Sequence, residues 1–243
     1  MEVFGQTDVG CLRTVNQDAF ATRVFSGELS AAVVCDGMGG AKSGEIASEV
    51  ALESFITDIG DAFGEGRLTL DAEDTVAAAV ARAGAAVVRR AANDPECEGM
   101  GTTLVAAVVT GAEAIIANVG DSRAYHISDD SILRVTRDHS VVEDMVARGE
   151  ITFEQARHHP SRNLITRVLG ASHGSGADVF PLIVSRGDYI LLCSDGLSNL
   201  LSSDEILVLT LAGDTLEDSC EKLVGTALER GAPDNVTVAI IKI

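Results

Sequence analysis

Basic residues are scarce in this sequence. Its 243 residues include 18 lysines and arginines against 37 aspartates and glutamates, which gives a formal net charge of −19. A chain this acidic repels phosphate backbones and anionic lipids. Aromatic residues make up only 4% and form no set for stacking on bases. The composition therefore excludes nucleic acids and membrane surfaces as partners, whereas it permits the binding of cations.

Cysteine pairs and long apolar runs are also absent. The 5 cysteines, at positions 11, 35, 97, 193 and 220, are odd in number and show no C-x-x-C spacing, which argues against a disulfide framework and a structural zinc site. No run approaches the ~18 apolar residues of a transmembrane helix. The N-terminus has neither a basic nor an apolar leader. We therefore expect a cytoplasmic protein in a reducing compartment.

The chain has only 4 prolines and no internal repeat, so we expect one domain over residues 1–243. Hydrophobic residues make up 46%, enough for a substantial core. Apolar runs predict strands at 31–35, 103–109, 114–119, 123–127, 188–193 and 236–243. Apolar residues at helical spacing predict helices over 46–59, 76–87 and 216–228, and a fourth helix that begins near Ser203.

Short polar turns join several of the predicted strands. Thr110-Gly111-Ala112 and Ser128-Asp129-Asp130 are typical of hairpins. Consecutive hairpins argue against a doubly wound parallel sheet, so we predict an α+β fold with a mostly antiparallel sheet system flanked by helices. Residues 137–163 are polar, and we interpret them as a helical excursion over the surface, a candidate flap.

Four aspartates stand where a predicted strand begins or ends. Asp36 and Asp195 follow apolar runs and precede a glycine, Asp121 follows a third run, and Asp234 comes just before the last strand. Taken singly, each position is better explained as a turn, because Asp-Gly is a common turn dipeptide. The recurrence of the pattern, together with Asp18 near the N-terminus, weakens that explanation.

Strands that brought these carboxylates together would create a cation site. Carboxylates that close cannot all stay ionised without a cation, and oxygen ligands without histidine or cysteine select magnesium, manganese or calcium over zinc. The Gly37 carbonyl would be available as a further ligand. Arg13 precedes Asp18 by five positions. It is either a salt-bridge partner or a fork for a substrate oxyanion, and the spacing does not distinguish the two.

A series of short motifs follows along the chain: Arg13-x-x-Asn16-Gln17-Asp18, Asp36-Gly37-Met38-Gly39-Gly40, Gly44-Glu45-x-Ala47-Ser48, Gly101-Thr102-Thr103, Val119-Gly120-Asp121-Ser122-Arg123, Asp138-His139-Ser140, Thr166-Arg167-Val168-Leu169-Gly170, Ser194-Asp195-Gly196-Leu197 and Asp234-Asn235-Val236-Thr237. In this order and spacing they resemble the bacterial branch of the metal-dependent protein phosphatases (protein phosphatase type 2C, the PPM family). The resemblance covers residues 7–241. Each motif is weak alone, whereas the ordered set is highly specific.

The resemblance implies a fold and a reaction. The fold is a four-layer α-β-β-α sandwich of two mostly antiparallel sheets flanked by helix pairs, with a flap at about 137–170. The reaction is the hydrolysis of phosphoserine and phosphothreonine in proteins, by attack of a water that bridges two metal ions. Manganese or magnesium would be the cofactor, as two or possibly three ions.

The resemblance also assigns the metal ligands. Asp36 would bridge two ions, and the Gly37 carbonyl would bind one of them. Asp195 and Asp234 would hold the other ion. Asp121, with Asp195, would match the extra metal site of bacterial members.

Two further residues receive roles in the same way. Asp18 would act on the metal shell through water. Arg13 would bind the phosphate, so that Arg13, Asp36 and Asp195 form the catalytic set.

The sequence departs from the family pattern where a proton donor is expected. Met38 occupies the position of a histidine in eukaryotic members, and Ala41 that of a histidine in many bacterial ones. The general acid is then either a water on the metal or His139. Gln17 replaces a glutamate of eukaryotic members, which argues against direct metal ligation there.

The expected function is therefore a phosphoprotein phosphatase. By family analogy it opposes a serine/threonine kinase of the same cell, which is itself among the expected substrates, and it acts as a monomer. One alternative is a metal-dependent hydrolase of small phosphate esters. Another is a non-catalytic phosphoprotein-binding regulator on the same fold, which the presence of all five aspartates disfavours.

Overall fold

Two antiparallel sheets form the centre of the protein in the computed structural model, which describes residues 1–40, 43–65, 71–171 and 176–243. The first sheet has the order β1 (Glu2–Asp8), β11 (Val236–Lys242), β10 (Tyr189–Cys193), β7 (Arg123–Ser128) and β8 (Ser131–Arg134). The second has the order β2 (Asp18–Ser26), β3 (Leu29–Met38), β5 (Leu104–Thr110), β6 (Glu113–Val119) and β9 (Asp178–Ile183), and the short β4 (Gly101–Thr102) pairs with the end of β3.

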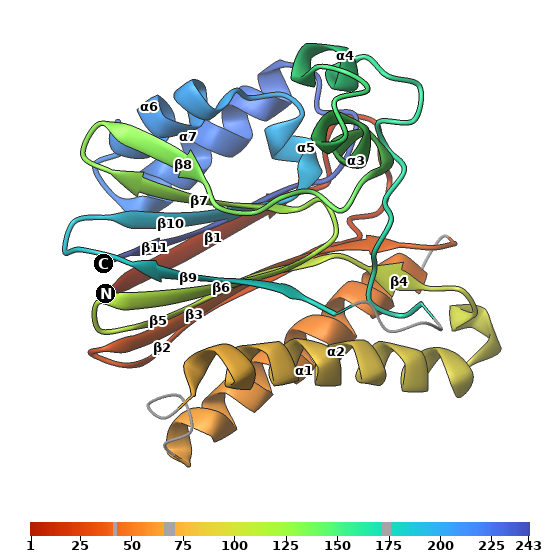
Figure 1. Cartoon of the computed structure of the whole chain (residues 1–243), viewed down its shortest axis with the longest axis horizontal. Coiled ribbons are helices and arrows are strands. Elements are labelled where there is room, and N and C mark those ends of the chain that lie inside the picture. Colours follow the sequence, from red (N-terminus) through yellow and green to blue (C-terminus); the bar gives the residue numbers. More distant parts are fainter. Residues whose placement is uncertain (41–42, 66–70, 172–175) are drawn as a thin grey trace.

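Helices cover the outer face of each sheet (Figure 1). The pair α1 (Ser43–Gly64) and α2 (Ala72–Ala92) packs on the second sheet, and the pair α6 (Ser203–Leu211) and α7 (Leu216–Glu229) packs on the first. The short helices η2 (Pro95–Cys97) and α5 (Asp195–Ser198) lie in connections. The prediction of four layers in the order α-β-β-α is therefore confirmed.

Three apolar layers hold these elements together. Between the two sheets, one buried apolar cluster includes Val34, Ile116 and Leu192, which are all fully buried. Alternate residues of β3, such as Val33 and Cys35, point instead to the layer under α1 and α2. Burying a side chain of this size stabilises the fold by roughly 1.5–3 kcal/mol. Because both faces of β3 are covered, its sequence is a continuous apolar run rather than an alternating one.

The six predicted strands correspond to the central strands β3, β5, β6, β7, β10 and β11. Besides the two-residue β4, the strands to which we assigned no range are β1, β2, β8 and β9, which are the edges of the two sheets. Edge strands have a half-exposed face and carry polar residues or proline, and β9 contains Pro181. Their local patterns are therefore weaker than those of the buried centre.

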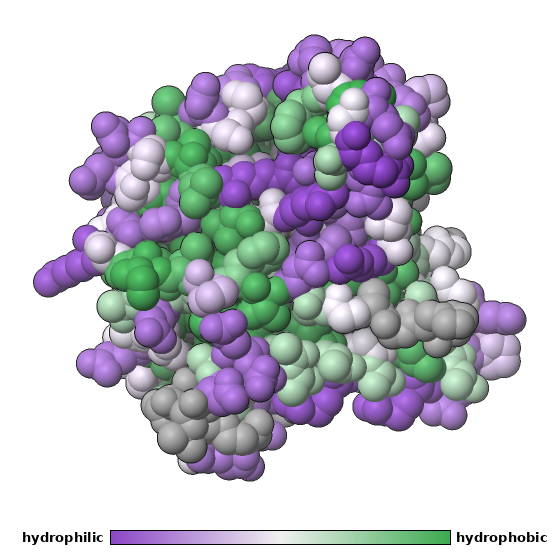
Figure 2. Space-filling model, in the orientation of Figure 1, coloured by the Kyte–Doolittle hydropathy of each residue, from purple (hydrophilic) through white to green (hydrophobic). Residues whose placement is uncertain are grey.

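The segment of residues 137–170, named the flap segment below, contains two short helices. These are α3 (Val141–Ala147) and α4 (Phe153–Arg157), with Ser140 and Thr152 as their N-caps. The helical excursion is thus present, and its action as a flap stays a prediction. Among the most hydrophilic side chains on this face of the molecule are those next to α3 and α4, whereas hydrophobic side chains are visible along the edge between the sheets (Figure 2).

The remaining composition-based expectations concern cysteine and membranes. All 5 cysteines are free thiols, and every one except Cys11 is buried, as expected for small apolar side chains. Over the described ranges, no helix combines the length and apolar character needed to cross a bilayer.

Candidate metal centre

The five predicted aspartates gather at one end of the two sheets. Asp18 begins β2 and lies directly opposite Asp36 on the neighbouring strand β3. Asp195 opens α5 immediately after β10, and Asp234 precedes β11, which pairs with β10. Asp121 lies in the tight connection between β6 and β7. The antiparallel order of the strands therefore brings together residues that are up to 216 positions apart in the chain, from 18 to 234.

Electrostatics confirm that these carboxylates share one environment. Burial raises the pKa of Asp36 well above its ordinary range, and the charges of Asp18, Asp195, Asp121 and Asp234 raise it further. The same causes operate at its neighbours. Burial, with repulsion from nearby carboxylates, raises the pKa of Asp18 and of Asp121 to about 7 and that of Asp195 to about 6. The cluster thus holds more negative charge than its surroundings compensate.

Asp18 is held by a buried hydrogen-bond network. Its Oδ2 accepts hydrogen bonds from the hydroxyls of Ser194 at 2.7 Å and Thr237 at 2.6 Å. These donors lower the pKa of Asp18, but by less than burial raises it. The side chain of Asp18 therefore has a fixed position at the junction of the two sheets.

Gly37 follows Asp36 in a place where only glycine fits. Its N–H donates to the carbonyl of Gln17 at 3.0 Å, and a Cβ atom on Gly37 would collide with the carbonyl of Gly44 at the start of α1. The backbone can thus approach the carboxylates closely, as the position of a carbonyl ligand requires. Gln17 itself contributes main-chain contacts and a 3.4 Å hydrogen bond from its amide to Gly40.

Arg13 lies beside Asp234 rather than free in solvent. Its guanidinium donates to Asp234 Oδ2 at 2.8 Å, with 53% of the Arg13 side chain exposed. Of the two roles left open for Arg13, the salt bridge is therefore present. The contact uses one terminal nitrogen, so other N–H donors of the guanidinium remain available for a phosphate group.

The donor set fits a hard divalent cation. The side chains are carboxylates, and Asp121 Oδ1 is buried without a hydrogen-bond donor from any described residue. Within the described part of the chain, however, no three acidic, histidine or cysteine side chains converge enough to enclose an ion by themselves. Asp234 instead faces Arg13, and Asp195 accepts from Asn199 at 3.0 Å. A cation at this site would compete with Arg13 for Asp234.

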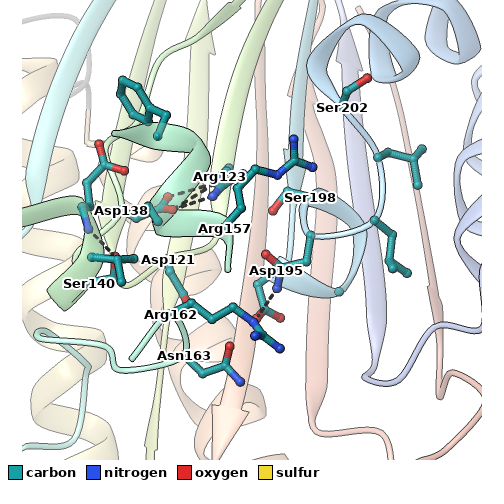
Figure 3. Close-up of a pocket in the computed structure, with 18 of the residues that line it drawn as sticks. Asp121, Arg123, Asp138, Ser140, Arg157, Arg162, Asn163, Asp195, Ser198 and Ser202 are labelled. Carbon is teal, nitrogen blue, oxygen red and sulfur yellow. Dashed lines mark hydrogen bonds and ion pairs between the residues drawn. The ribbon is translucent and has the colours of Figure 1, made fainter. Parts of the chain in front are cut away.

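A groove of about 680 Å³ leads away from the carboxylates toward the flap segment. Asp121, Asp195 and Asp234 line one part of it. Arg157 and Arg162 reach into it from the flap segment, toward Ser198 and Asp195 (Figure 3). Sequence reasoning missed both arginines, although basic residues are scarce in this chain, with 18 in all, and their positions are a usable signal.

A buried ion pair forms the wall behind this groove. Arg123 binds Asp138 through two nitrogens, with shortest distances of 3.0 Å and 2.7 Å (Figure 3). Arg134 also donates to Asp138, at 2.6 Å. Both Arg123 and Asp138 belong to quoted motifs, but no role was assigned to them. Fork-like pairs of this kind fix geometry, so they connect the start of the flap segment to the first sheet.

Three positions bear on the question of the general acid: Met38 and Ala41, where family members carry a histidine, and His139. Ala41 lies outside the described residues. Met38 pairs with Gly101 at the end of β3 and carries no titratable proton. His139 is buried, and both of its ring nitrogens contact other protein groups. Nδ1 contacts the Gly120 N–H, and Nε2 contacts Asp178 at 3.1 Å and the Arg167 guanidinium at 3.3 Å.

Comparisons with known proteins agree with this geometry. The family model "Protein phosphatase 2C" matches residues 13–232. Protein phosphatase PhpP of Streptococcus pneumoniae is 36% identical over 242 residues, which cover 99% of this chain and 97% of that protein. The structure of the serine/threonine phosphatase Stp1 from Staphylococcus aureus superposes with a TM-score of 0.89 at 35% identity, covering 100% of this chain and 94% of that one. The PstP catalytic domain in complex with 2 manganese ions has a TM-score of 0.84 at 32% identity, covering 98% and 96%.

Proposed function

This chain belongs to the bacterial branch of the protein phosphatase 2C family, and from that premise we propose how its site works as a serine/threonine protein phosphatase. The observation that carries the mechanism is the buried carboxylate cluster with its uncompensated charge. Such a cluster is stable near neutral pH when divalent cations supply the missing positive charge. Phosphoproteins are the substrates of this enzyme class.

The cation ligands are proposed residue by residue. Asp36 and the Gly37 carbonyl would hold one ion, with Asp36 shared by a second ion that Asp195 and Asp234 would hold. Asp18 would act on the shell of ligands through water, and Asp121 would serve an additional ion together with Asp195. Manganese fits the oxygen donor set, and a structure of a relative contains 2 manganese ions. Magnesium fits it equally well.

When bound, the ions would lower the pKa of a coordinated water toward about 7 and act as Lewis acids on a phosphoryl oxygen. The protein itself contributes by holding the negatively charged carboxylates in fixed positions. The strand ends hold Asp18 and Asp36 rigidly opposite each other, which fixes the carboxylates before substrate arrives.

Arg13 is the group that we propose for the phosphate. Neutralising Asp234 with a cation would weaken its hold on the guanidinium, because the pair depends on the negative charge of Asp234. The freed N–H groups of Arg13 could then donate to the equatorial oxygens of the phosphoryl group. Cation binding and phosphate binding would in this way support each other.

The substrate chain would lie in the groove. Its wall carries Arg157 and Arg162, which place two basic side chains at the approach to an otherwise acidic molecule. A serine/threonine kinase among the substrates, action as a monomer and a cytoplasmic location are proposed as well. They rest on the family and the composition.

The direct test is phosphate release from a phosphothreonine peptide with Mn²⁺, with Mg²⁺ and with excess chelator. We expect release with either metal and none with chelator, because the substrate dianion and the carboxylates repel each other without cations. Asp36→Asn should abolish release. Asp58→Asn, which removes a charge from a surface ion pair with Arg82 on the helix layer, is the matched control and should keep full activity. Metal-independent release would refute the proposed mechanism.

A further inference from the structure

One oxygen of the buried Asp121 carboxylate has no hydrogen-bond donor among the described residues. Only 8% of the residue is exposed, yet Oδ1 accepts no hydrogen bond from a described residue. Its position is therefore set by the main chain on either side. Gly120, directly before it, has a φ of +111°, and a Cβ atom there would run into Thr103. The local backbone is thus a special conformation that something must hold in place.

His139 holds that backbone at both polar groups of Gly120. The main-chain N–H of His139 donates to the Gly120 carbonyl at 2.9 Å, and the Gly120 N–H donates to Nδ1 of the His139 ring at 3.1 Å. The carbonyl has a second donor, the amide of Asn118 at 3.2 Å. The buried Gly120 N–H, in contrast, is paired in the described structure with the imidazole.

The hydrogen bond from Gly120 fixes the tautomer of the ring. Because Nδ1 accepts a hydrogen bond, the hydrogen of the neutral ring is on Nε2. Nε2 then donates to Asp178 Oδ2 at 3.1 Å, and the other oxygen of Asp178 accepts from Arg167 at 2.8 Å. Asp178 lies on β9 directly opposite Asn118 on β6. The ring is 6% exposed and is oriented from both sides.

The same residue joins the flap segment to this connection. The His139 carbonyl accepts from Thr166 N–H at 2.8 Å, and Ser140 forms an isolated bridge with Ile165. The beginning and the end of the flap segment therefore meet at His139. Both ends of the flap segment therefore contact the residue whose ring accepts from the Gly120 N–H.

We propose that His139 is a positioning residue, which places the Asp121 carboxylate for cation binding by accepting the Gly120 N–H at Nδ1, with Asp178 and Arg167 keeping the ring in the required tautomer. This inference rests on the proposed function, because it takes Asp121 to be a cation ligand. It differs from the role of proton donor considered above. A ring with one nitrogen on Gly120 and the other on Asp178 has no free nitrogen for a leaving group.

Two substitutions of similar polarity separate the two ring nitrogens. In His139→Asn the amide oxygen can occupy the place of Nδ1 and accept from Gly120. In His139→Gln the longer side chain reaches the place of Nε2 and leaves Gly120 N–H without its acceptor. The chelator-treated full chain is titrated with Mn²⁺ by calorimetry, and the exchange of the Gly120 amide is followed by NMR.

Two reference variants complete the set. Asp121→Asn defines which Mn²⁺ binding step involves this carboxylate. His126→Gln makes the same substitution in a half-buried histidine–aspartate pair, His126 with Asp188 at 2.8 Å, for which no contact with Gly120 is found in the described structure. We expect His126→Gln to leave Mn²⁺ binding and Gly120 exchange unchanged.

His139→Gln should weaken the Asp121-dependent step by about tenfold or more, a typical loss when an outer support of a metal site is removed. It should also speed exchange of the Gly120 amide. His139→Asn should stay within about threefold of the wild type in affinity and keep slow exchange. Phosphate release is measured separately. A failure of the proposed phosphatase mechanism can therefore be distinguished from a failure of the proposed positioning role of His139.

Three results would overturn the inference. Equal behaviour of the Asn and Gln variants in both readouts would show that the Nδ1 contact does not position Asp121. Normal Mn²⁺ binding and exchange in both variants, with phosphate release lost in both, would make His139 a catalytic residue. Unchanged Mn²⁺ binding by the Asp121→Asn protein would show that Asp121 is not a cation ligand, so that positioning its carboxylate could not affect cation binding.

Discussion

The strand-end carboxylates and the flap segment lie on two sides of one groove but are built differently. Asp121, in one wall, is 8% exposed and lies between the central strands β6 and β7. In the flap segment, α4 has no buried residue and α3 has only Val142. One wall of the groove is thus fixed by the core, whereas the part of the other wall that α3 and α4 form rests on short helices with few buried side chains.

This difference separates chemistry from access. Groups that must hold a charge in a defined place gain from strands that cannot move without disrupting the core. Groups that meet a variable protein substrate gain from a surface segment that adapts at low cost. We therefore expect substitutions on the two walls to change different kinetic quantities, and the predictions follow in order of decreasing effect.

The largest loss of activity should come from a substitution in the buried carboxylate cluster. Asp36→Asn removes the carboxylate that is proposed to be shared by two ions, so kcat should fall by at least about a thousandfold. The metal-free variant should not be less stable than the wild type, because it loses a buried charge that is repelled by its neighbours. Phosphate release and thermal unfolding measure the two quantities. An unfolded variant would leave the activity loss without mechanistic meaning, so circular dichroism must accompany the assay.

The next effect is a pH dependence of metal-free stability. The folded-state pKa of Asp18 and of Asp121 is about 7 and that of Asp195 about 6, above the ordinary value of 3.8. The folded protein therefore binds more protons than the unfolded chain between about pH 4 and pH 7, and stability falls as pH rises through that range. With chelator, Tm should be lower at about pH 8 than at about pH 5, and Mn²⁺ should raise Tm most at the higher pH.

The control for that pH effect is Asp36→Asn, which removes one of the interacting charges. The drop in Tm between the two pH values should be smaller in this variant. If the drop were unchanged, general repulsion across a chain of charge −19 would be the better explanation.

A smaller effect belongs to the adaptable wall. Arg157→Gln and Arg162→Gln should each raise KM for an acidic phosphopeptide by about three- to tenfold, since one solvent-exposed ionic contact is lost. kcat and the hydrolysis of p-nitrophenyl phosphate should change little. Arg148→Gln is the matched control, because Arg148 lies on the same segment but pairs with Glu150 outside the groove. A loss of kcat in either groove variant would show instead that this arginine takes part in the chemical step.

The smallest effect is expected away from the groove. Glu205 on α6 pairs with Arg230 after α7, and this contact lowers the pKa of Glu205 to about 2. A lowered pKa contributes stability above the ordinary value of 4.5, and this contribution is lost as pH falls toward about 2. Both side chains are exposed, so Glu205→Gln should lower Tm by no more than about 3 °C at neutral pH and by less below about pH 3.

How far the sequence predicts the fold depends on burial. Runs such as Val33-Val34-Cys35 predict central strands. Both faces of a central strand are covered, so nearly every residue in it is apolar. The edge strand β9 contains Pro181 and ends at Ile183, which is 75% exposed, so its local pattern is not that of a buried strand. An edge strand is defined by its neighbour rather than by its own residues.

The candidate site shows the same division. Asp36, Asp121, Asp195 and Asp234 are visible in the sequence as polar residues beside apolar runs, and the ordered motifs resemble the family. The pairing of Arg13 with Asp234, however, joins residues 221 positions apart and has no local sign. The contact of His139 with Gly120 is equally invisible, because it depends on where the flap segment returns to the sheet.

The sequence by itself determined the central strands, the main helices, the acidic character and the chemical type of the site, because these follow from local periodicity and from side-chain chemistry. The tertiary structure decided which strands are edges, which carboxylates share a buried environment and which groups support them. Those properties depend on contacts between distant residues, and the free energy that selects such contacts comes from packing the whole core.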